Sequence, residues 1–566
     1  MKKQLIECVP NISEGRDLSK INEIAKTVET VDGVKLLDVD PGAATNRTVI
    51  TFVGEPEKVI EAAFRLIKKA NELIDMRKHL GEHPRFGATD VCPLVPISGI
   101  SLEETAEYAK KLGERVGKEL EIPVYLYEKA ATEEKRKNLA NCRAGEYEGL
   151  KEKLADPNWK PDYGPAIFNE KVQKSGATAI SARDFLVAYN VNLNSTSTST
   201  RRANAVAFDI REAGRVKREG NPITGKKVLD KDGNVVRIPG KLKAVKGIGW
   251  YIDEYGIAQI SYNLTNISIT PVHIAFDETV KAADKRGLRV TGSELIGLIP
   301  LKAMLDAADY FLQKQERSLG VSEKEKIKIA IKSLGLDDLK PFNPKEKIIE
   351  YVLEEQSSKK LIDLTLKEFA DETAGESPAP GGGSISAYVG TLGVALGTMV
   401  ANLSANKRGW DDKWEYYSDW AVKGQKYKET LLALVDEDTN AFNKIIEAFR
   451  LPKSNLQEKE MRAKAIEDAT KYATEVPFKV METAQQSMEV MLEMAKNGLQ
   501  NSLSDAGVGA LCAKTAVHGA YFNVRINAKD IKDKAFAEEI LSKAKQIFNK
   551  AEQLEKQVLE ILNKAI

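Results

Sequence analysis

Two of the chain's four histidines lie close together in the segment HLGEHPRFGATD, which runs from His79 to Asp90. His83 directly precedes Pro84, and a residue before proline favours an extended loop backbone over a helix. An imidazole in such a loop can accept and donate a proton near neutral pH, and Arg85 beside it can hold a carboxylate through two hydrogen bonds. These residues predict acid–base chemistry on an anionic substrate. The alternative interpretation is a solvated loop histidine.

A second group of candidates lies around the sequence DVDPGAATNR. Asp40 ends a predicted strand and precedes Pro41-Gly42, a place where functional carboxylates often lie. An Asp before Pro-Gly also commonly caps a turn, so that interpretation stays open. Arg47 is either a ligand for an anionic group or one half of a surface ion pair.

A metal site is not predicted near these residues. His79 and His83 are four positions apart, but Gly81 and Pro84 break the helix that would align the two imidazoles. The chain has no HExxH sequence, and no third ligand is evident. We therefore expect no metal cofactor.

The second half of the chain carries a glycine loop in the sequence SPAPGGGSISA. Gly381, Gly382 and Gly383 come just before a predicted helix that begins at Ser384, so backbone N–H groups there can meet an anion. The loop is not a P-loop, because the required lysine is absent. The small residues that follow in the helix are also explained by close helix–helix packing.

Acidic residues interrupt an apolar helical pattern in LLALVDEDTNAF. Asp436 and Asp438 are two positions apart, so they diverge by about 200° on a helix and do not form a carboxylate pair. One of them can face inward and titrate at a raised pKa through burial, or both can belong to a solvated acidic stripe. Asn523, in GAYFNVRIN, is a candidate for binding polar ligand groups or for capping.

The elements that must position these groups change in character along the chain. β-branched strand patterns alternate with amphipathic helical patterns at first, and long helical patterns dominate the C-terminal part. The sequence predicts a multi-domain protein with two α+β, ferredoxin-like subdomains followed by an all-α helical bundle. The expected boundaries are 1–178 and 179–325 for the two subdomains, 326–360 for a charged linker, and 361–566 for the bundle.

Charge and cysteine content exclude several classes of protein. Lys and Arg number 84 and Asp and Glu number 83, which argues against wholesale binding of nucleic acid or of an anionic membrane. The four cysteines are widely separated and form no CxxC, so neither a disulfide scaffold nor a structural zinc module is expected. No signal peptide and no apolar run of about 18 residues are found, so no membrane span and a cytoplasmic location are expected.

One local segment departs from this even balance. Residues 211–246 contain 11 basic and 4 acidic residues, an excess of seven positive charges, with a predicted hairpin turn at Lys231-Asp232-Gly233-Asn234. A solvated surface hairpin explains this composition. A sharper hypothesis is electrostatic steering of a substrate that carries several carboxylates.

Long motifs in the first half resemble the formiminotransferase domain of the formimidoyltransferase-cyclodeaminase family. The motifs are CVPNISEG, LLDVDPGAATNRTVITFVG, GEHPRFGATDVCPLVP and CRAGEYEGL, and the similarity continues through KGIGWYIDEYGIAQ. The resemblance implies that His83 is the acid–base residue of formimidoyl transfer and that Asp40 lies in the same site. It also implies that Arg47 and Arg85 bind substrate. The family's folate-binding stretch falls on Gly164 to Gly176, including Pro165 and Phe168. Extra residues around Asn169 to Gln173 leave its individual contacts open.

Motifs in the second half are similar to the cyclodeaminase domain of the same family, namely SPAPGGGSISA, LVDEDTNAF and GAYFNVRIN. By motif position, Asp438 is the implied acid–base residue, with Gly381, Gly382, Gly383, Ser384 and Asn523 as implied ligand contacts.

The resemblance implies a bifunctional enzyme of histidine degradation that acts on N-formimino-L-glutamate and on tetrahydrofolate, which is expected in its polyglutamylated form. It also implies a homo-oligomer in which the helical domain forms a dimer contact. The alternative is a single-activity formimidoyl- or formyltransferase whose helical domain only mediates oligomerisation.

Overall fold

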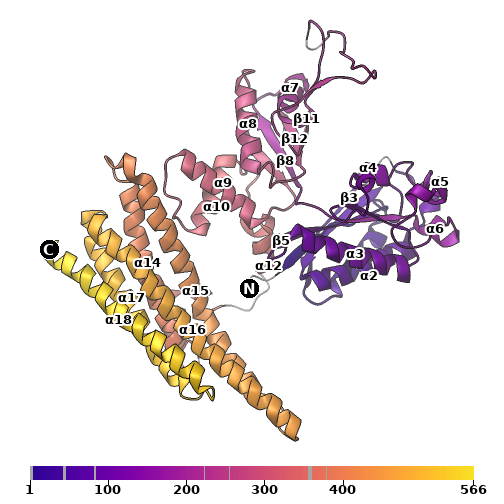
Figure 1. The fold of residues 1–566 in the computed structure, drawn as a ribbon. Helices are drawn as coiled ribbons and strands as arrows, with labels where there is room; N and C mark the ends of the chain where they lie inside the picture. The colour runs from indigo at the N-terminus through magenta and orange to yellow at the C-terminus, as the bar shows by residue number, and fades with distance from the viewer. Residues whose placement is uncertain are drawn as a thin grey trace. The chain divides into compact units, whose positions relative to one another are not determined.

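The computed structural model describes residues 4–42, 46–81, 85–221, 224–253, 255–354, 360–377 and 379–565. The chain divides into two compact units, one of residues 1–303 with 334–355 and the other of residues 304–333 with 356–566. Both sheets that carry more than two strands belong to the first unit, and the long helices belong to the second (Figure 1). The predicted order, an α+β region with two sheets followed by a helical bundle, is confirmed.

The first sheet has seven strands in the order β1-β4-β2-β5-β7-β6, with β3 added on β4. Its strands are β1 (Leu5–Cys8), β2 (Asn11–Ile12), β3 (Val34–Gly42), β4 (Arg47–Gly54), β5 (Thr89–Ser98), β6 (Val124–Glu128) and β7 (Thr178–Ala182). Its main helices are α1 (Leu18–Glu29), α2 (Pro56–Leu73) and α3 (Leu102–Glu119), and its short ones are α4 (Leu139–Cys142), α5 (Leu150–Ala155) and α6 (Glu170–Ser175). The series β1, α1, β3, β4, α2, β5 follows the βαββαβ order of a ferredoxin-like unit.

Local sequence explains why these helices begin where they do. Asp17 accepts hydrogen bonds from the backbone N–H groups that open α1. Ser101 and Glu104 form a capping box, in which the Ser101 Oγ accepts from Glu104 N at 3.1 Å and Glu104 Oε2 accepts from Ser101 N at 2.8 Å. Such a cap contributes about 1 kcal/mol to helix stability. The apolar faces of the helices are buried in one core that lies against the first sheet.

The second sheet repeats the same pattern with four antiparallel strands in the order β11-β12-β8-β13. Its strands are β8 (Val187–Leu193), β11 (Val245–Ile252), β12 (Ile257–Leu264) and β13 (Val290–Ile296), with helices α7 (Arg201–Ile210) and α8 (Val272–Asp284). A two-stranded pair, β9 (Arg215–Val216) with β10 (Arg237–Ile238), belongs to the basic segment 211–246. The predicted turn is present there, because Asp230 N donates to Asn234 O at 2.8 Å.

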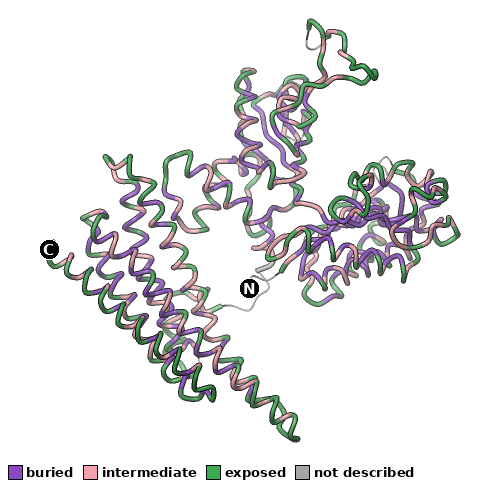
Figure 2. The backbone as a smooth tube through the Cα atoms, in the orientation of Figure 1, coloured by how far each residue is buried: buried purple, intermediate pink, exposed green. Residues whose placement is uncertain are grey.

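The second unit is a bundle of long helices. They are α14 (Gly382–Ala405), α15 (Trp414–Arg450), α16 (Leu456–Asn497), α17 (Leu503–Ala528) and α18 (Lys534–Ala565), preceded by α13 (Leu366–Thr373). Buried positions follow the faces that these helices turn toward one another, and exposed positions follow their outer faces (Figure 2). The remaining helices are α9 (Leu301–Lys314), α10 (Glu323–Leu334), α11 (Pro344–Lys347) and α12 (Ile349–Glu354).

Small residues let the bundle helices approach closely, as one interpretation of the α14 sequence predicted. A Cβ atom at Gly393 would lie 2.7 Å from the Gly509 carbonyl oxygen on α17, and one at Gly424 would lie 2.1 Å from Thr398 Oγ1. Among the described residues, α14 is the one helix long and apolar enough to cross a membrane. However, 61% of its most apolar window is buried within the protein, as in the core helix of a folded bundle.

The segment Ser318–Gly320 packs directly onto the bundle. Leu319 N donates to Ser418 Oγ at 3.0 Å, and the Gly320 carbonyl accepts from Asn402 Nδ2 at 2.9 Å and from Gln425 Nε2 at 3.0 Å. A Cβ atom at Gly320 would lie 2.3 Å from the Ala421 Cβ, so the approach requires glycine. This contact explains why residues 304–333 group with the bundle.

Candidate active sites

The first candidate site surrounds the segment His79 to Asp90. His83, with Glu82 and Pro84, lies outside the described residues. Asp40 is exposed on β3, and its backbone pairs with Val49 on β4. The two ends of the histidine segment are described, and both are tightly held.

Arg47 belongs to a buried charge cluster centred on Asp90. The Asp90 carboxylate is fully buried, and its Oδ2 lies 2.5 Å from Arg47 Nη1 and 2.8 Å from Arg143 Nη1. Its Oδ1 accepts from Phe86 N at 3.1 Å. Arg47 Nε also donates to Asn11 Oδ1 at 3.0 Å. One carboxylate therefore fixes two guanidinium groups, and removing it would leave both cations without their buried partner.

Arg85 is buried and makes a closed set of contacts. Its guanidinium binds the Glu148 carboxylate through two hydrogen bonds, Nη1 to Oε2 at 2.8 Å and Nη2 to Oε1 at 2.7 Å. Glu146 Oε2 lies 3.3 Å from the same Nη1. The sequence predicted that Arg85 holds a carboxylate through two hydrogen bonds, and the structure shows this geometry. The carboxylate, however, is the side chain of Glu148 and not a substrate group. Arg85 thus anchors the end of the histidine segment.

His79 fixes the other end of the segment. Arg85 Nε donates to His79 Nδ1 at 3.2 Å, so the His79 proton lies on Nε2, which donates to the Asn46 carbonyl at 2.8 Å. Burial lowers the pKa of His79, so its ring is neutral at pH 7. The Asn46 side chain in turn donates to Leu80 O at 3.0 Å.

The stretch from Gly164 to Gly176 contacts the same region. Its extra residues form α6, capped by Asn169. Tyr147 links the two parts: its N–H donates to Arg85 O at 3.0 Å, its ring packs 6.1 Å from that of Phe168, and its hydroxyl donates to Gln173 O. Gly176 has φ +66°, and a Cβ there would lie 2.2 Å from Phe86 O. Gly164 (φ +81°) and the neighbouring Pro165 lie at the other end of the stretch, beside Ile122.

Sequence reasoning did not assign roles to Asp90, Arg143, Glu146 and Glu148. All four lie in motifs that carry the family resemblance, GEHPRFGATDVCPLVP and CRAGEYEGL. The sequence pattern that could have indicated them is a charged residue next to apolar positions. Which of these charged side chains form ion pairs with one another depends on how the strands pair, and sequence spacing does not show it.

The second candidate site lies at the start of α14. Gly381 is the N-cap residue of α14 and has no side chain to accept a hydrogen bond from the first turn. The Asp438 carboxylate, from α15, accepts such a hydrogen bond instead. Asp438 Oδ2 accepts from Ser384 N at 2.9 Å, and Ser384 Oγ lies 3.1 Å from the same oxygen. The structure thus brings together the glycine loop, Ser384 and Asp438.

Glycine is needed where the helix start meets the carboxylate. A Cβ atom at Gly383 would lie 2.1 Å from Asp438 Oδ1. At Gly382 the nearest atom to such a Cβ is Asn523 Nδ2 from α17, at 3.4 Å, which is ordinary contact. Asn523 therefore lies beside the same helix start, with its Nδ2 donating to Gly519 O at 2.9 Å.

Two opposing effects set the protonation of Asp438. Burial raises its pKa, and hydrogen bonds from the Ser384 side chain and backbone lower it, with a net increase. Ser384 Oγ also lies 2.9 Å from the Val435 carbonyl oxygen. The serine can therefore donate to Val435 while a protonated Asp438 donates to the serine, so the site accommodates both forms of the acid.

Asp436 faces a different partner, as its position on the helix predicted. Its Oδ1 accepts from Leu361 N at 2.7 Å. Within the described ranges, no three His, Cys, Asp or Glu side chains gather in a way that could hold a metal ion.

Comparison with known proteins decides the family. Three family models match in succession: "Formiminotransferase domain, N-terminal subdomain" over residues 5–183, "Formiminotransferase domain" over 188–354 and "Formiminotransferase-cyclodeaminase" over 365–546. A formimidoyltransferase-cyclodeaminase of Mus musculus is 43% identical over 94% of this chain and 94% of its own length. The chain belongs to the formimidoyltransferase-cyclodeaminase family.

Members of related families match each half of the chain separately. A glutamate formimidoyltransferase of Thermoplasma acidophilum is 43% identical and covers 55% of this chain and 92% of its own length. A methenyltetrahydrofolate cyclohydrolase of Methylorubrum extorquens is 33% identical and covers 36% of this chain and 97% of its own length. The two sites of this formimidoyltransferase-cyclodeaminase family member therefore lie in halves that each resemble a separate enzyme.

Proposed function

We propose that this chain transfers the formimidoyl group of N-formimino-L-glutamate to tetrahydrofolate and then cyclodeaminates the 5-formimidoyltetrahydrofolate to 5,10-methenyltetrahydrofolate and ammonia. The observation that carries the proposal is the identity with formimidoyltransferase-cyclodeaminases across nearly the whole chain. The chain is thus a multifunctional transferase and lyase of folate-dependent histidine degradation.

A coupled assay tests both activities together. The full chain is supplied with N-formimino-L-glutamate and tetrahydrofolate, and glutamate, ammonia and methenyltetrahydrofolate are followed in parallel. We expect all three to form in equal amounts. Ammonia is the decisive product, because a relative of the helical half is a cyclohydrolase by name. Glutamate without ammonia would leave only a single-activity transferase.

In the transfer step, His83 acts as the acid–base residue, with Asp40 beside it. The N5 amine of tetrahydrofolate loses a proton as it attacks the formimidoyl carbon, and the departing glutamate nitrogen gains one, so one imidazole can serve both. The anchors at His79 and Arg85 support this role, since they fix both ends of the loop that carries His83. Arg47, held by Asp90, binds a substrate carboxylate, and the stretch Gly164 to Gly176 contacts folate.

In the cyclodeamination step, Asp438 delivers a proton to the departing nitrogen as N10 closes the ring. A carboxylic acid with a raised pKa is suited to this task. Ser384 keeps the acid in place in both protonation states, and the N–H groups at the start of α14 and the Asn523 amide bind polar groups of the folate.

Replacing Gly383 with alanine is expected to lower cyclodeamination about 100-fold, because the new Cβ overlaps Asp438 and displaces the acid by about 1 Å. Formimidoyl transfer should stay unchanged. Gly382→Ala is the matched control, since it adds the same methyl group one residue earlier, where contact is ordinary. Steady-state rates with 5-formimidoyltetrahydrofolate measure the effect, and equal rates for the two variants would count against the role of Asp438.

The natural co-substrate is proposed to be polyglutamylated tetrahydrofolate, steered by the basic segment 211–246. Lys226, Lys227 and Lys231 are exposed on this segment. Reversing all three charges to Glu is expected to raise KM for the pentaglutamate about threefold or more, because several attractive charge pairs are lost. KM for the monoglutamate should hardly change. An equal rise in KM for the pentaglutamate and the monoglutamate would contradict the hypothesis that the segment steers the polyglutamate tail.

A homo-oligomer with a dimer contact in the helical domain is also proposed. Apolar side chains are exposed along neighbouring faces of α14 and α17, namely Leu392, Met399 and Leu403 with Val508 and Leu511. The double variant Leu392→Asp with Met399→Asp is expected to sediment as a smaller species, because burying carboxylates at a contact is costly. Leu456→Asp, at the exposed start of α16, is the control, and sedimentation velocity is the measurement.

A cytoplasmic location is proposed for the enzyme. The four cysteines are widely separated in the sequence and form no CxxC. This arrangement fits a reducing compartment. The proposed chemistry needs no metal, no nucleic acid and no membrane span.

A further inference from the structure

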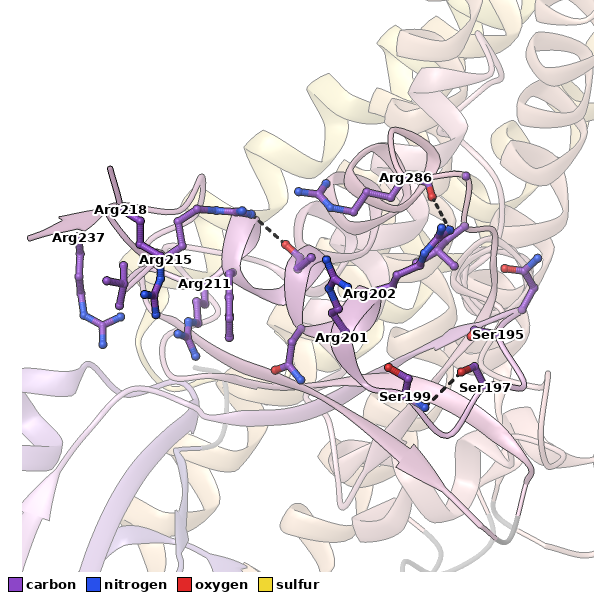
Figure 3. A pocket seen from close by; sticks show the side chains of 17 residues that line it. Ser195, Ser197, Ser199, Arg201, Arg202, Arg211, Arg215, Arg218, Arg237 and Arg286 are labelled. Atoms are coloured by element: carbon purple, nitrogen blue, oxygen red, sulfur yellow. Dashed lines mark hydrogen bonds between the residues drawn. The ribbon is translucent and has the colours of Figure 1, made fainter. Parts of the chain in front are cut away.

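A large pocket in the part of the chain that the structure describes shares no lining residue with either candidate active site. It has a volume of about 1040 Å³ and is lined by seven arginines. They come from α7, from the segment that carries β9 and β10, and from the loop after α8, and Figure 3 shows their side chains spread along α7, with Arg201 and Arg202 at its start. No Asp or Glu is among the lining residues that the structure describes.

Few anionic groups balance this charge. Asp209, behind the pocket on α7, forms ion pairs with both Arg215 and Arg286. Burial, followed by the nearby charge of Arg237, lowers the pKa of Arg211, and burial, followed by Arg286, lowers the pKa of Arg215. The guanidinium groups nevertheless stay charged, so the pocket concentrates positive charge that a bound anion would neutralise.

The shape of the donor set indicates phosphate. The first turn of α7 lines the pocket, and its N-cap residue Thr200 makes no side-chain cap, so this helix start is open to an anion. Ser195, Ser197 and Ser199 line the same side (Figure 3). A carboxylate is planar and satisfies one or two guanidinium groups, whereas a phosphate presents oxygens in several directions. Arginines from three separate elements suit the tetrahedral anion.

We propose that this arginine pocket is a binding site for a chain of linked phosphates, either free polyphosphate or the triphosphate of a nucleotide. The ligand bridges α7 and the basic segment 211–246, since both contribute guanidinium groups. The site is separate from the lysines Lys226, Lys227 and Lys231, which do not line it.

Isothermal titration of the full chain tests the proposal, with sodium tripolyphosphate, ATP and pterin-free penta-γ-glutamate as probes. The variant Arg201→Gln with Arg202→Gln removes two exposed guanidinium groups from the pocket. Lys226→Gln with Lys227→Gln removes the same charge elsewhere on the segment. Thermal unfolding without ligand checks that both variants fold.

We expect saturable binding of tripolyphosphate, weakened about tenfold or more by the arginine variant and less than about twofold by the lysine variant. Tighter binding of ATP would identify a nucleotide as the source, and equal binding would identify the phosphate chain alone. Absence of saturable phosphate binding, equal losses in the two variants, or binding of pentaglutamate alone would each overturn the proposal. None of these readings depends on either enzymatic activity.

Discussion

Replacing Asp438 with asparagine is expected to lower ammonia release from 5-formimidoyltetrahydrofolate by about 10²- to 10⁴-fold, because the site loses its acid. The asparagine Oδ1 can still accept from Ser384 N, so the helix start keeps its partner. In the wild type, the rate should fall as pH rises through the raised pKa of Asp438, because the protonated form delivers the proton. Stopped-flow rates across a pH series measure both effects.

Stability provides the control for this variant. Because folding raises the pKa of Asp438, the stability it contributes is full below its ordinary pKa and is lost as pH rises through the folded value. Asparagine does not ionise, so the variant should unfold at the same temperature as the wild type or higher at pH 7. A variant that keeps ammonia release, or that loses it only by unfolding, would contradict the assignment.

Replacing His83 with alanine is expected to lower glutamate release in the transfer reaction by about 10²- to 10⁴-fold, because no other imidazole takes its place. His79 cannot substitute, since both of its ring nitrogens are engaged with Arg85 and Asn46. Cyclodeamination of supplied 5-formimidoyltetrahydrofolate should remain at the wild-type rate. Initial rates of glutamate and of ammonia, measured separately, test the prediction.

The two variants serve as controls for each other. A mixture of His83→Ala and Asp438→Asn chains should restore ammonia release from N-formimino-L-glutamate, because one chain supplies the intermediate that the other consumes. The restored rate should show a lag while free intermediate accumulates. A mixture that remains inactive would mean that one substitution damages both sites.

Sequence patterns predicted the order of elements well, because amphipathic periods and caps act over a few residues. The turn at Lys231-Asp232-Gly233-Asn234, for example, follows directly from the local sequence. Ser384, which follows the glycine loop, and Asp438 lie 54 residues apart in the chain, and only the family resemblance connected them. Helix packing brings them together.

Long-range charge pairing could not be predicted in this way. Arg85 was expected to hold a substrate carboxylate, but the fold supplies Glu148 for it. The composition of the basic segment 211–246 predicted a local excess of positive charge but no pocket. The pocket is lined by arginines from three parts of the chain that come together only in the folded protein. In both cases the partner is chosen by tertiary structure, and the sequence contains the charges but not their distances.

The packing of Gly320 on the bundle has a consequence for protein engineering. A helical half expressed from residue 361 onward would lose Gly320 and expose the Asn402 and Gln425 amides with the surface around Ala421. A boundary placed before residue 304 would retain this segment, although it would carry residues 334–355 away from the sheets they pack with. Residues 304–333 therefore belong with the helical unit, and residues 334–355, which follow them in the chain, belong with the unit that contains the sheets. No single cut of the chain keeps both segments with their own units, so we expect the two units to be obtained intact only when both parts of the chain are co-expressed.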